Sequence, residues 1–191
     1  MQNATENALE AKRLGLVDSS PTAGNMRWLS DQQYHTTLGI HELLWRYAVE
    51  RFPKERECPI LILGYGSLPI AIELSQWTYP ITYVAQSEKE KKQVITDCAA
   101  QAGNLSQLYT LDWYVNVPKA RVCIFTGLLG GLTDRQIYKW MDLVLRRVAY
   151  VVCAEHTGRD WKEILEKRYH VTGIRYNHKK YTFLEIRRKY H

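Results

Sequence analysis

Two glycines mark the feature of this chain with the clearest chemical meaning. An apolar run, Ile60 to Leu63, opens into Gly64-Tyr65-Gly66, and a helical pattern begins directly after it. Glycine lets the backbone turn sharply and approach a ligand closely, while the free amide groups at a helix start point back at the same place. A nucleotide-type cofactor site begins in this way, although two glycines between a strand and a helix also serve tight packing alone.

Acid and base chemistry at the same edge would come from Glu155 and His156. Both lie just beyond a further apolar run, Ala149 to Ala154. Ligands of open parallel sheets bind outside the carboxyl ends of the strands, so these two residues are the candidate catalytic acid or base. The alternative for His156 is a turn residue whose hydrogen bonds are satisfied locally.

Strands and helices must alternate to bring such residues to one edge. Apolar runs predict strands at 60–63, 81–85, 108–111, 120–125 and 149–154. Helical spacing predicts helices after the glycine turn, over 88–102, and from the capping box of Thr133 and Gln136 onward. Five strands alternating with helices predict an α/β fold with a parallel sheet covered on both faces.

A long helix is predicted before the first strand, from Ser30 to Arg51, where Phe52-Pro53 ends it. Its core-facing stripe is predicted as Tyr34, Leu38, His41, Trp45 and Ala48. On that stripe, we interpret His41 as a packed residue rather than a ligand.

The end of the chain separates the possible parallel folds. A helix over 161–168 is followed by two strands, Val171 to Tyr176 and Tyr181 to Ile186, with a linker of hairpin length. The last strand must therefore run antiparallel to its neighbour. This order of elements, together with Gly64-Tyr65-Gly66, resembles the class I, S-adenosylmethionine-dependent methyltransferases over residues 28–188. The resemblance implies a Rossmann-like, mainly parallel seven-stranded sheet with an antiparallel last strand.

In that family the first motif is an acid followed by Gly-x-Gly-x-Gly, and its glycines lie beneath the methionine part of the cofactor. Here Gly64, Tyr65 and Gly66 match, while Ile62 replaces the acid and Leu68 the third glycine. The family's second motif ends in an acid that holds the ribose hydroxyls. This chain offers Gln86 and Ser87 beyond the second strand instead, and the Gln86 amide can still donate to a ribose.

The remaining matches are better. Asp112 and Trp113 stand where the family has an acid that accepts from the adenine amino group beside a ring that stacks on the base. Thr126 and Gly127 begin a loop, continuing to Asp134, that resembles the segment flanking the transferred methyl in small-molecule methyltransferases. The chain lacks the Asn-Pro-Pro-Tyr type of sequence and the Lys-Asp-Lys-Glu tetrad of base- and ribose-methylating enzymes. The resemblance thus implies S-adenosyl-L-methionine as cofactor and leaves the acceptor open.

The 191 residues suffice for one domain. We expect a flexible arm at 1–27 and a methyltransferase-like domain at 28–191, divided into a helical lid (28–57) and a Rossmann-like core (58–191). The four cysteines are scattered, and Cys123 and Cys153 lie in apolar strands, so we expect buried thiols, no metal site and no disulfides. No segment reads as a secretion signal or a membrane span. We expect a soluble, cytoplasmic protein.

Positive charge gathers at the end of the chain. The net charge is +6, and the last 33 residues hold ten Lys or Arg against four Asp or Glu, which accounts for the whole excess. The residues of interest are Lys179, Lys180, Arg187, Arg188 and Lys189. Such an edge can bind RNA or an acidic protein partner, or it can be a solvated edge hairpin that discourages strand pairing.

Three functions remain open from the sequence. The leading one is a methyltransferase acting on a small molecule or RNA, since methyl transfer needs little beyond positioning and a base. The second is a methyltransferase-like pseudoenzyme that serves as a scaffold or binding subunit, which the missing acids favour. The third is a nicotinamide-dependent enzyme, which Pro69 at the third glycine position and the reversed last strand disfavour.

Overall fold

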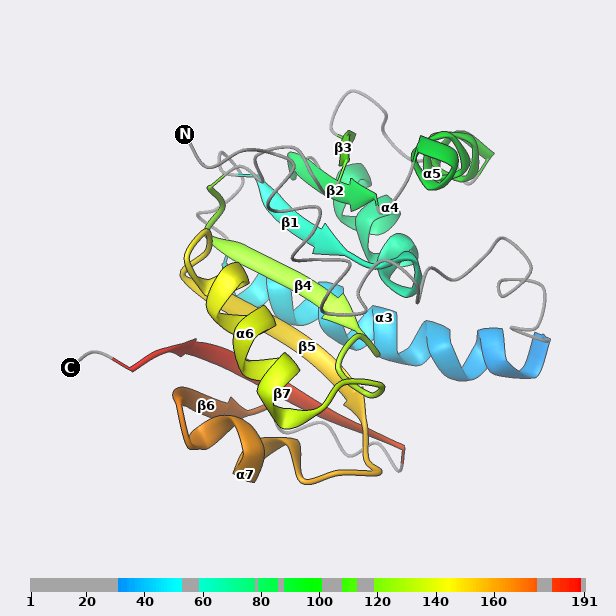
Figure 1. Ribbon diagram of the computed structural model, residues 1–191. Coiled ribbons are helices and arrows are strands. Elements are labelled where there is room, and N and C mark those ends of the chain that lie inside the picture. The colour runs from blue at the N-terminus through cyan, green and yellow to red at the C-terminus, as the bar shows by residue number, and fades with distance from the viewer. Residues whose placement is uncertain are drawn as a thin grey trace.

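A seven-stranded sheet forms the centre of the protein. The computed structural model describes residues 31–52, 59–77, 79–85, 88–100, 108–112, 119–174 and 180–189; the predicted arm, 1–27, lies outside them. The strand order is β3-β2-β1-β4-β5-β7-β6 (Figure 1). The strands are β1 (Ile60–Leu63), β2 (Ile81–Ala85), β3 (Leu108–Asp112), β4 (Val122–Thr126), β5 (Tyr150–His156), β6 (Tyr169–Gly173) and β7 (Tyr181–Arg188).

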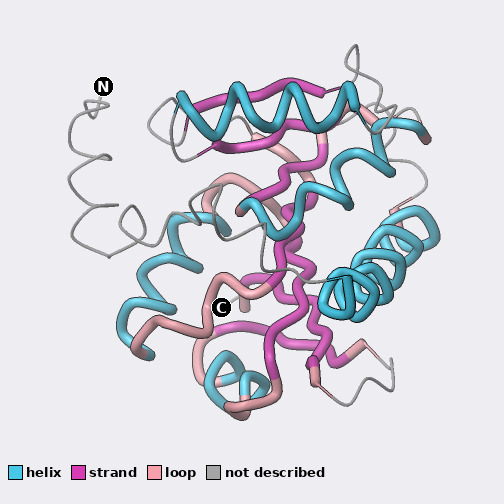
Figure 2. The backbone as a smooth tube through the Cα atoms, turned by 90° about the vertical axis from the view of Figure 1, so that its right-hand side faces the viewer, coloured by secondary structure: helices cyan, strands magenta, loops and turns pink. Residues whose placement is uncertain are grey.

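Helices cover both faces of this sheet (Figures 1 and 2). One face carries α3 (Asp31–Arg51), α4 (Leu68–Gln76) and α5 (Glu88–Ala100), and the other carries α6 (Asp134–Leu145) and α7 (Trp161–Glu166). Central strands are apolar throughout because successive side chains enter different cores. In β1, Ile60 and Ile62 pack beneath α3 and α4, while Leu61 and Leu63 pack beneath α6.

The strand directions confirm the predicted fold. Strands β1 to β5 pair in parallel, and β7 runs antiparallel to both of its neighbours, β5 and β6. One boundary differs from the prediction, since α7 ends at Glu166 and β6 begins at Tyr169 rather than Val171. The reason is that the buried Tyr169 side chain is held in the core, where its hydroxyl donates to Asp142 Oδ1 at 2.7 Å.

The helix before β1 forms as predicted, but its core stripe is rotated. Ile40, Leu44 and Ala48, four residues apart, are buried in the core beneath it. Trp45 lies at the margin, half-buried, with its ring 5.4 Å from that of Trp77. The prediction placed Trp45 in the core because several neighbouring rows of side chains on this helix have the same helical spacing. The spacing alone does not show which row faces the sheet.

Two local predictions are confirmed. Thr133 and Gln136 form the capping box of α6, in which Thr133 N donates to Gln136 Oε1 at 2.8 Å. Cys123 and Cys153 are fully buried free thiols, and burial raises the pKa of both. Cys58 lies outside the described residues. Among the described helices, none is long and apolar enough to cross a membrane.

Candidate functional site

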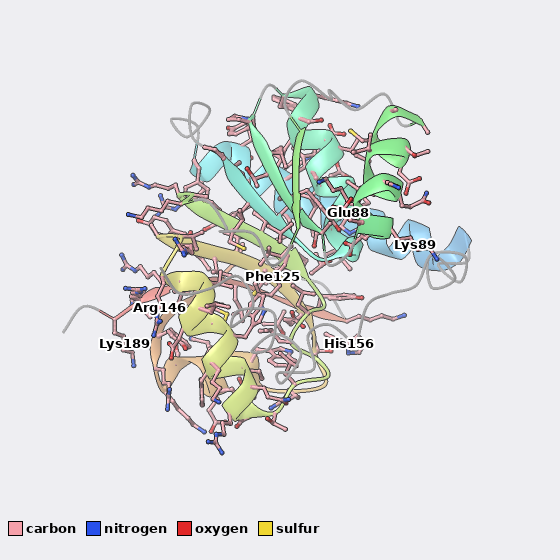
Figure 3. All side chains as sticks on the ribbon, turned by 45° about the horizontal axis from the view of Figure 1, so that its top comes forward. Glu88, Lys89, Phe125, Arg146, His156 and Lys189 are labelled. Carbon is pink, nitrogen blue, oxygen red and sulfur yellow. The ribbon has the colours of Figure 1, made fainter. Side chains whose placement is uncertain are left out.

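The carboxyl ends of β1, β4 and β5 bring most of the predicted site residues together. Leu63 pairs with Phe125, and Thr126 pairs with Ala154, so the segments that follow these strands are neighbours. The adjacent segments are Gly64–Gly66, Thr126–Gly127 and Glu155–His156. Figure 3 shows His156 at this end of the sheet, opposite Arg146 and Lys189.

The residues predicted to contact adenine and ribose follow β2 and β3. Asp112 ends β3, two strands from β1, and its backbone pairs with Ala85 at the same edge. Its side chain and that of Tyr65 lie outside what the structure describes, as do residues Gln86, Ser87 and Trp113.

The first glycine of the turn is required by its backbone. Gly64 has φ +79°, in the left-handed region that side chains other than glycine rarely adopt. A Cβ atom added there would lie 2.7 Å from Leu128 Cδ2, closer than two carbon atoms can pack. Gly64 therefore shapes the turn and lets the loop after β4 approach it.

The second glycine lies at the surface beside Thr126. Gly66 is exposed, and a Cβ added to it would lie 3.3 Å from Thr126 Oγ1, with no other contact closer than 3.8 Å. The absent side chain thus lets the glycine turn lie close to the end of β4. The first turn of α4 begins just beyond the glycine turn, with Pro69 near its start, where a missing N–H costs nothing.

A buried serine fixes the glycine turn to β4. Ser67 N donates to Gly64 O at 2.9 Å, which closes the turn. Its side-chain oxygen accepts from Thr126 N at 2.9 Å and lies 3.3 Å from Thr126 Oγ1. Sequence reasoning did not single out Ser67. The available signal was a polar residue at the start of an otherwise apolar helix, where a buried hydroxyl needs a partner.

A buried histidine holds the turn from the other side. His41 of α3 has its Nε2 atom 2.6 Å from Gly66 O, and a carbonyl only accepts, so Nε2 carries the proton and donates. Burial lowers the pKa of His41 to about 4, because the charged ring would lose its water; the hydrogen bond to Gly66 opposes this shift. His41 is therefore neutral near pH 7, and its buried Nδ1 has no hydrogen-bond partner among the described residues.

Glu155 holds the loop that follows β4. Its Oε1 atom accepts from Leu128 N at 2.9 Å and from Leu129 N at 3.0 Å. Its Oε2 atom is buried and has no partner in the described part of the chain. Burial raises the pKa of Glu155 to about 7, and the two backbone hydrogen bonds offset only part of that shift. Glu155 thus positions the loop against which Gly64 packs.

The two candidate acid or base residues do not form a pair. Successive residues of a strand point to opposite faces, so Glu155 faces the α6 side and His156 the other side. His156 is exposed, and its ring packs against Tyr181 with the centroids 5.5 Å apart. Of these two residues, only the exposed His156 can contact a molecule at this edge without rearrangement of the loop after β4.

Comparison with known proteins gives matches in structure alone. No family model and no curated protein sequence matches the chain. Magnesium protoporphyrin IX methyltransferase of Synechocystis PCC 6803, crystallised with bound SAM, superposes with a TM-score of 0.69 at 13% identity, covering 91% of this chain and 95% of its own.

Two further solved structures are similar. N-methyltransferase NodS of Bradyrhizobium japonicum WM9 gives a TM-score of 0.57 at 12% identity over 80% of this chain and 96% of its own. A TehB-like SAM-dependent methyltransferase of Corynebacterium glutamicum gives 0.53 at 12% identity over 69% and 80%. Together with the strand order and the antiparallel β7, these matches show that the chain has the fold of the class I S-adenosylmethionine-dependent methyltransferases.

Proposed function

We propose that this protein is an S-adenosylmethionine-dependent methyltransferase with its cofactor site at the carboxyl edge of the sheet. The observation that carries the proposal is the glycine turn at the carboxyl edge, where Gly66 is exposed beside the end of β4. This glycine stands between β1 and α4, and a large side chain there would cover the turn. The neighbouring α4 amide groups add a favourable field for a polar ligand group.

The residues proposed to hold the cofactor follow the family's pattern. The methionine part would lie over the glycine turn, the ribose beside the end of β2, the adenine beside the end of β3, and the methyl group near the end of β4. In that order these residues are Gly64, Tyr65, Gly66, Gln86, Ser87, Asp112, Trp113, Thr126 and Gly127. When bound, the sulfonium supplies an activated methyl group, so the chain's own residues need only position the acceptor and take its proton.

Other residues of this chain hold the glycine turn in place of the acid that the first motif lacks. Ile62 is buried in the core beneath α3 and α4, where a carboxylate would lose its water. The glycine turn is instead fixed by His41, which donates to Gly66 O, and by Ser67, which closes on Gly64 O. Loss of the acid is therefore compatible with an ordered turn.

The exposed candidate base would remove the proton from the methyl acceptor. His156 borders the edge and can take a proton from an acceptor, whereas the buried Glu155 already accepts two backbone hydrogen bonds.

We also propose that residues 28–57 cover the edge as a lid, since the first turns of α3 extend past the carboxyl ends of the strands (Figure 1). The acceptor class proposed is a small molecule or RNA.

Calorimetric titration tests the cofactor site directly. We expect S-adenosylmethionine and S-adenosylhomocysteine to bind, NAD not to bind, and the Gly66→Trp variant to lose at least about 100-fold in affinity, because the indole would cover the glycine turn over which the cofactor is proposed to lie. Gly173→Trp is the matched control, since Gly173 is exposed in β6 with open space around it. Unchanged affinity in Gly66→Trp would refute this site.

A pseudoenzyme remains the second candidate, favoured by the apolar Ile62 and by Ala85, rather than an acid, at the end of β2. Labelled S-adenosylmethionine offered with total RNA and with a protein-free small-molecule extract separates the two functions. Label in either pool supports the methyltransferase and identifies the acceptor class. Cofactor binding without any label transfer would instead support the scaffold.

A further inference from the structure

Several basic residues of the chain lie at the edge of the sheet opposite the candidate site. β7 is antiparallel, so it begins beside His156 at the carboxyl edge and ends at Arg188 beside the starts of the parallel strands. Lys180 therefore lies at one end of β7 and Arg187 at the other, about 25 Å apart at the usual rise per strand residue. The single hairpin patch suggested by the sequence is thus divided, and Lys179 lies outside the described residues.

Arginines from other elements join Arg187 and Arg188 at this amino edge. Arg121 stands directly before β4, and both Ala149 N and Tyr150 N donate to its carbonyl oxygen at 3.0 Å. Arg147, just after α6, accepts from Ala120 N at 3.1 Å through its own carbonyl. These bonds hold the segments before β4 and β5 together.

β5 connects those segments to the end of β7. Val151 pairs with Ile186, which places Arg187 beside the first residue of β5. Figure 3 shows Arg146 and Lys189 on this side of the molecule, away from His156.

Four arginines at this edge form no ion pair with a carboxylate in the part of the chain that the structure describes. Arg51 lies 3.3 Å from Glu185, whose Oε2 atom also accepts from the Tyr47 hydroxyl at 2.6 Å. In contrast, no described carboxylate forms an ion pair with Arg146, Arg147, Arg187 or Arg188, and all but the half-buried Arg187 are exposed. We define these four residues as the amino-edge arginines.

The chemistry of the amino-edge arginines fits a chain of phosphates. A guanidinium group presents a planar fork of donors that matches phosphate oxygens and stays charged at every relevant pH. Arg188 lies on the α6 side of β7, the side on which Arg146 and Arg147 follow the end of α6, while Arg187, the preceding strand residue, points to the other face. The positive groups therefore extend around the amino edge from one face of the sheet to the other. Tyr150 is already covered, with Arg51 5.6 Å and Arg121 5.9 Å from its ring centroid, which leaves phosphate contact rather than base stacking as the binding mode.

An apolar protein partner fits this edge less well. Protein interfaces centre on a buried apolar cluster. The large apolar side chains that are exposed in the described residues are Trp77, Ile95 and Leu143, and they belong to three separate helical segments. The amino edge therefore offers charge without a contiguous apolar centre.

We infer that the amino-edge arginines form a binding surface for the phosphate backbone of RNA, separate from the candidate cofactor site. Strands of four to eight residues place the two edges about 13 to 25 Å apart, so this surface does not hold the reacting group. It anchors a polymer without regard to sequence. The inference does not depend on methyl transfer.

Fluorescence anisotropy with a labelled 20-nucleotide oligouridylate tests this surface. Replacement of the four amino-edge arginines by glutamine is expected to lower affinity at least about 100-fold near 0.1 M salt, and to reduce the slope of log affinity against log salt by about three, because each lost phosphate contact releases fewer counterions. The matched control replaces four exposed cations elsewhere and is expected to change affinity less than about threefold. Its substitutions are Lys89→Gln, Lys92→Gln, Arg135→Gln and Lys162→Gln.

Three outcomes overturn the inference: absence of binding by the unaltered protein at low salt, equal losses in both fourfold variants, or displacement of the RNA by polyglutamate at equal charge concentration, which would assign the edge to acidic proteins. Circular dichroism confirms that each variant is folded. S-adenosylmethionine titration of the amino-edge variant separates the two proposals, since we expect its cofactor affinity to be unchanged.

Discussion

Gly64→Ala is expected to lower the free energy of unfolding by about 2 to 4 kcal/mol. Two effects add at this residue. The new side chain must adopt a left-handed backbone at φ +79°, and its Cβ would lie 2.7 Å from Leu128 Cδ2. Room for the Cβ must come from rotation of the Leu128 side chain, because the Leu128 backbone N–H is held by the buried Glu155. Urea denaturation followed by circular dichroism gives the loss directly.

Gly127→Ala separates the two effects. Gly127 also has a positive φ, +63°, but a Cβ there would meet no atom within 4 Å. We expect only the backbone cost of about 1 to 2 kcal/mol in this control. In the double variant Gly64→Ala with Leu128→Ala, the shortened side chain should recover part of the Gly64→Ala loss beyond additivity. Equal losses at both glycines, with strictly additive double-variant energies, would show that the packing against Leu128 is unimportant.

The second large effect concerns the pH dependence of stability, in which two buried groups oppose each other. Glu155 has a pKa of about 7 in the folded protein against an ordinary value of 4.5, so the folded state binds more protons in this window and is stabilised as pH falls from 7 to 4.5. His41 has a pKa of about 4 against an ordinary 6.5, so the unfolded state binds more protons and the folded state is destabilised as pH falls from 6.5 to 4.

Removing either group should reveal the pH dependence of stability that the other group causes. As the pH falls from 6.5 to 5, we expect the stability of Glu155→Gln to decrease by about 2 kcal/mol relative to that of the unaltered protein, since only His41 then titrates. His41→Phe should gain about 2 kcal/mol over the same interval, since only Glu155 then titrates. Glutamine keeps an oxygen that can accept from Leu128 N and Leu129 N, so the loop remains held.

Denaturation in urea at a series of pH values measures both slopes. Differences between each variant and the unaltered protein cancel the contributions of all other titrating groups. Parallel stability curves for the three proteins would contradict the assignment of these two buried residues. A double variant provides the control, because its curve should run parallel to that of the unaltered protein.

The sequence by itself determined the order and direction of the elements. Strands such as β1 are apolar at every residue because both faces are covered, and this pattern is readable without a structure. The antiparallel β7 follows from a linker too short for a crossover, and the start of α6 follows from Thr133 and Gln136, three residues apart. Local spacing also located the glycine turn at the carboxyl edge.

The tertiary structure alone decided how that edge is held together. His41 and Gly66 are 25 residues apart, Ser67 and Thr126 are 59 apart, and Glu155 and Leu128 are 27 apart. No local periodicity encodes such pairs, because they depend on which strands become neighbours. The basic residues at the end of the chain are close in sequence yet reach opposite edges, because Lys180 and Arg187 lie at opposite ends of the extended strand β7.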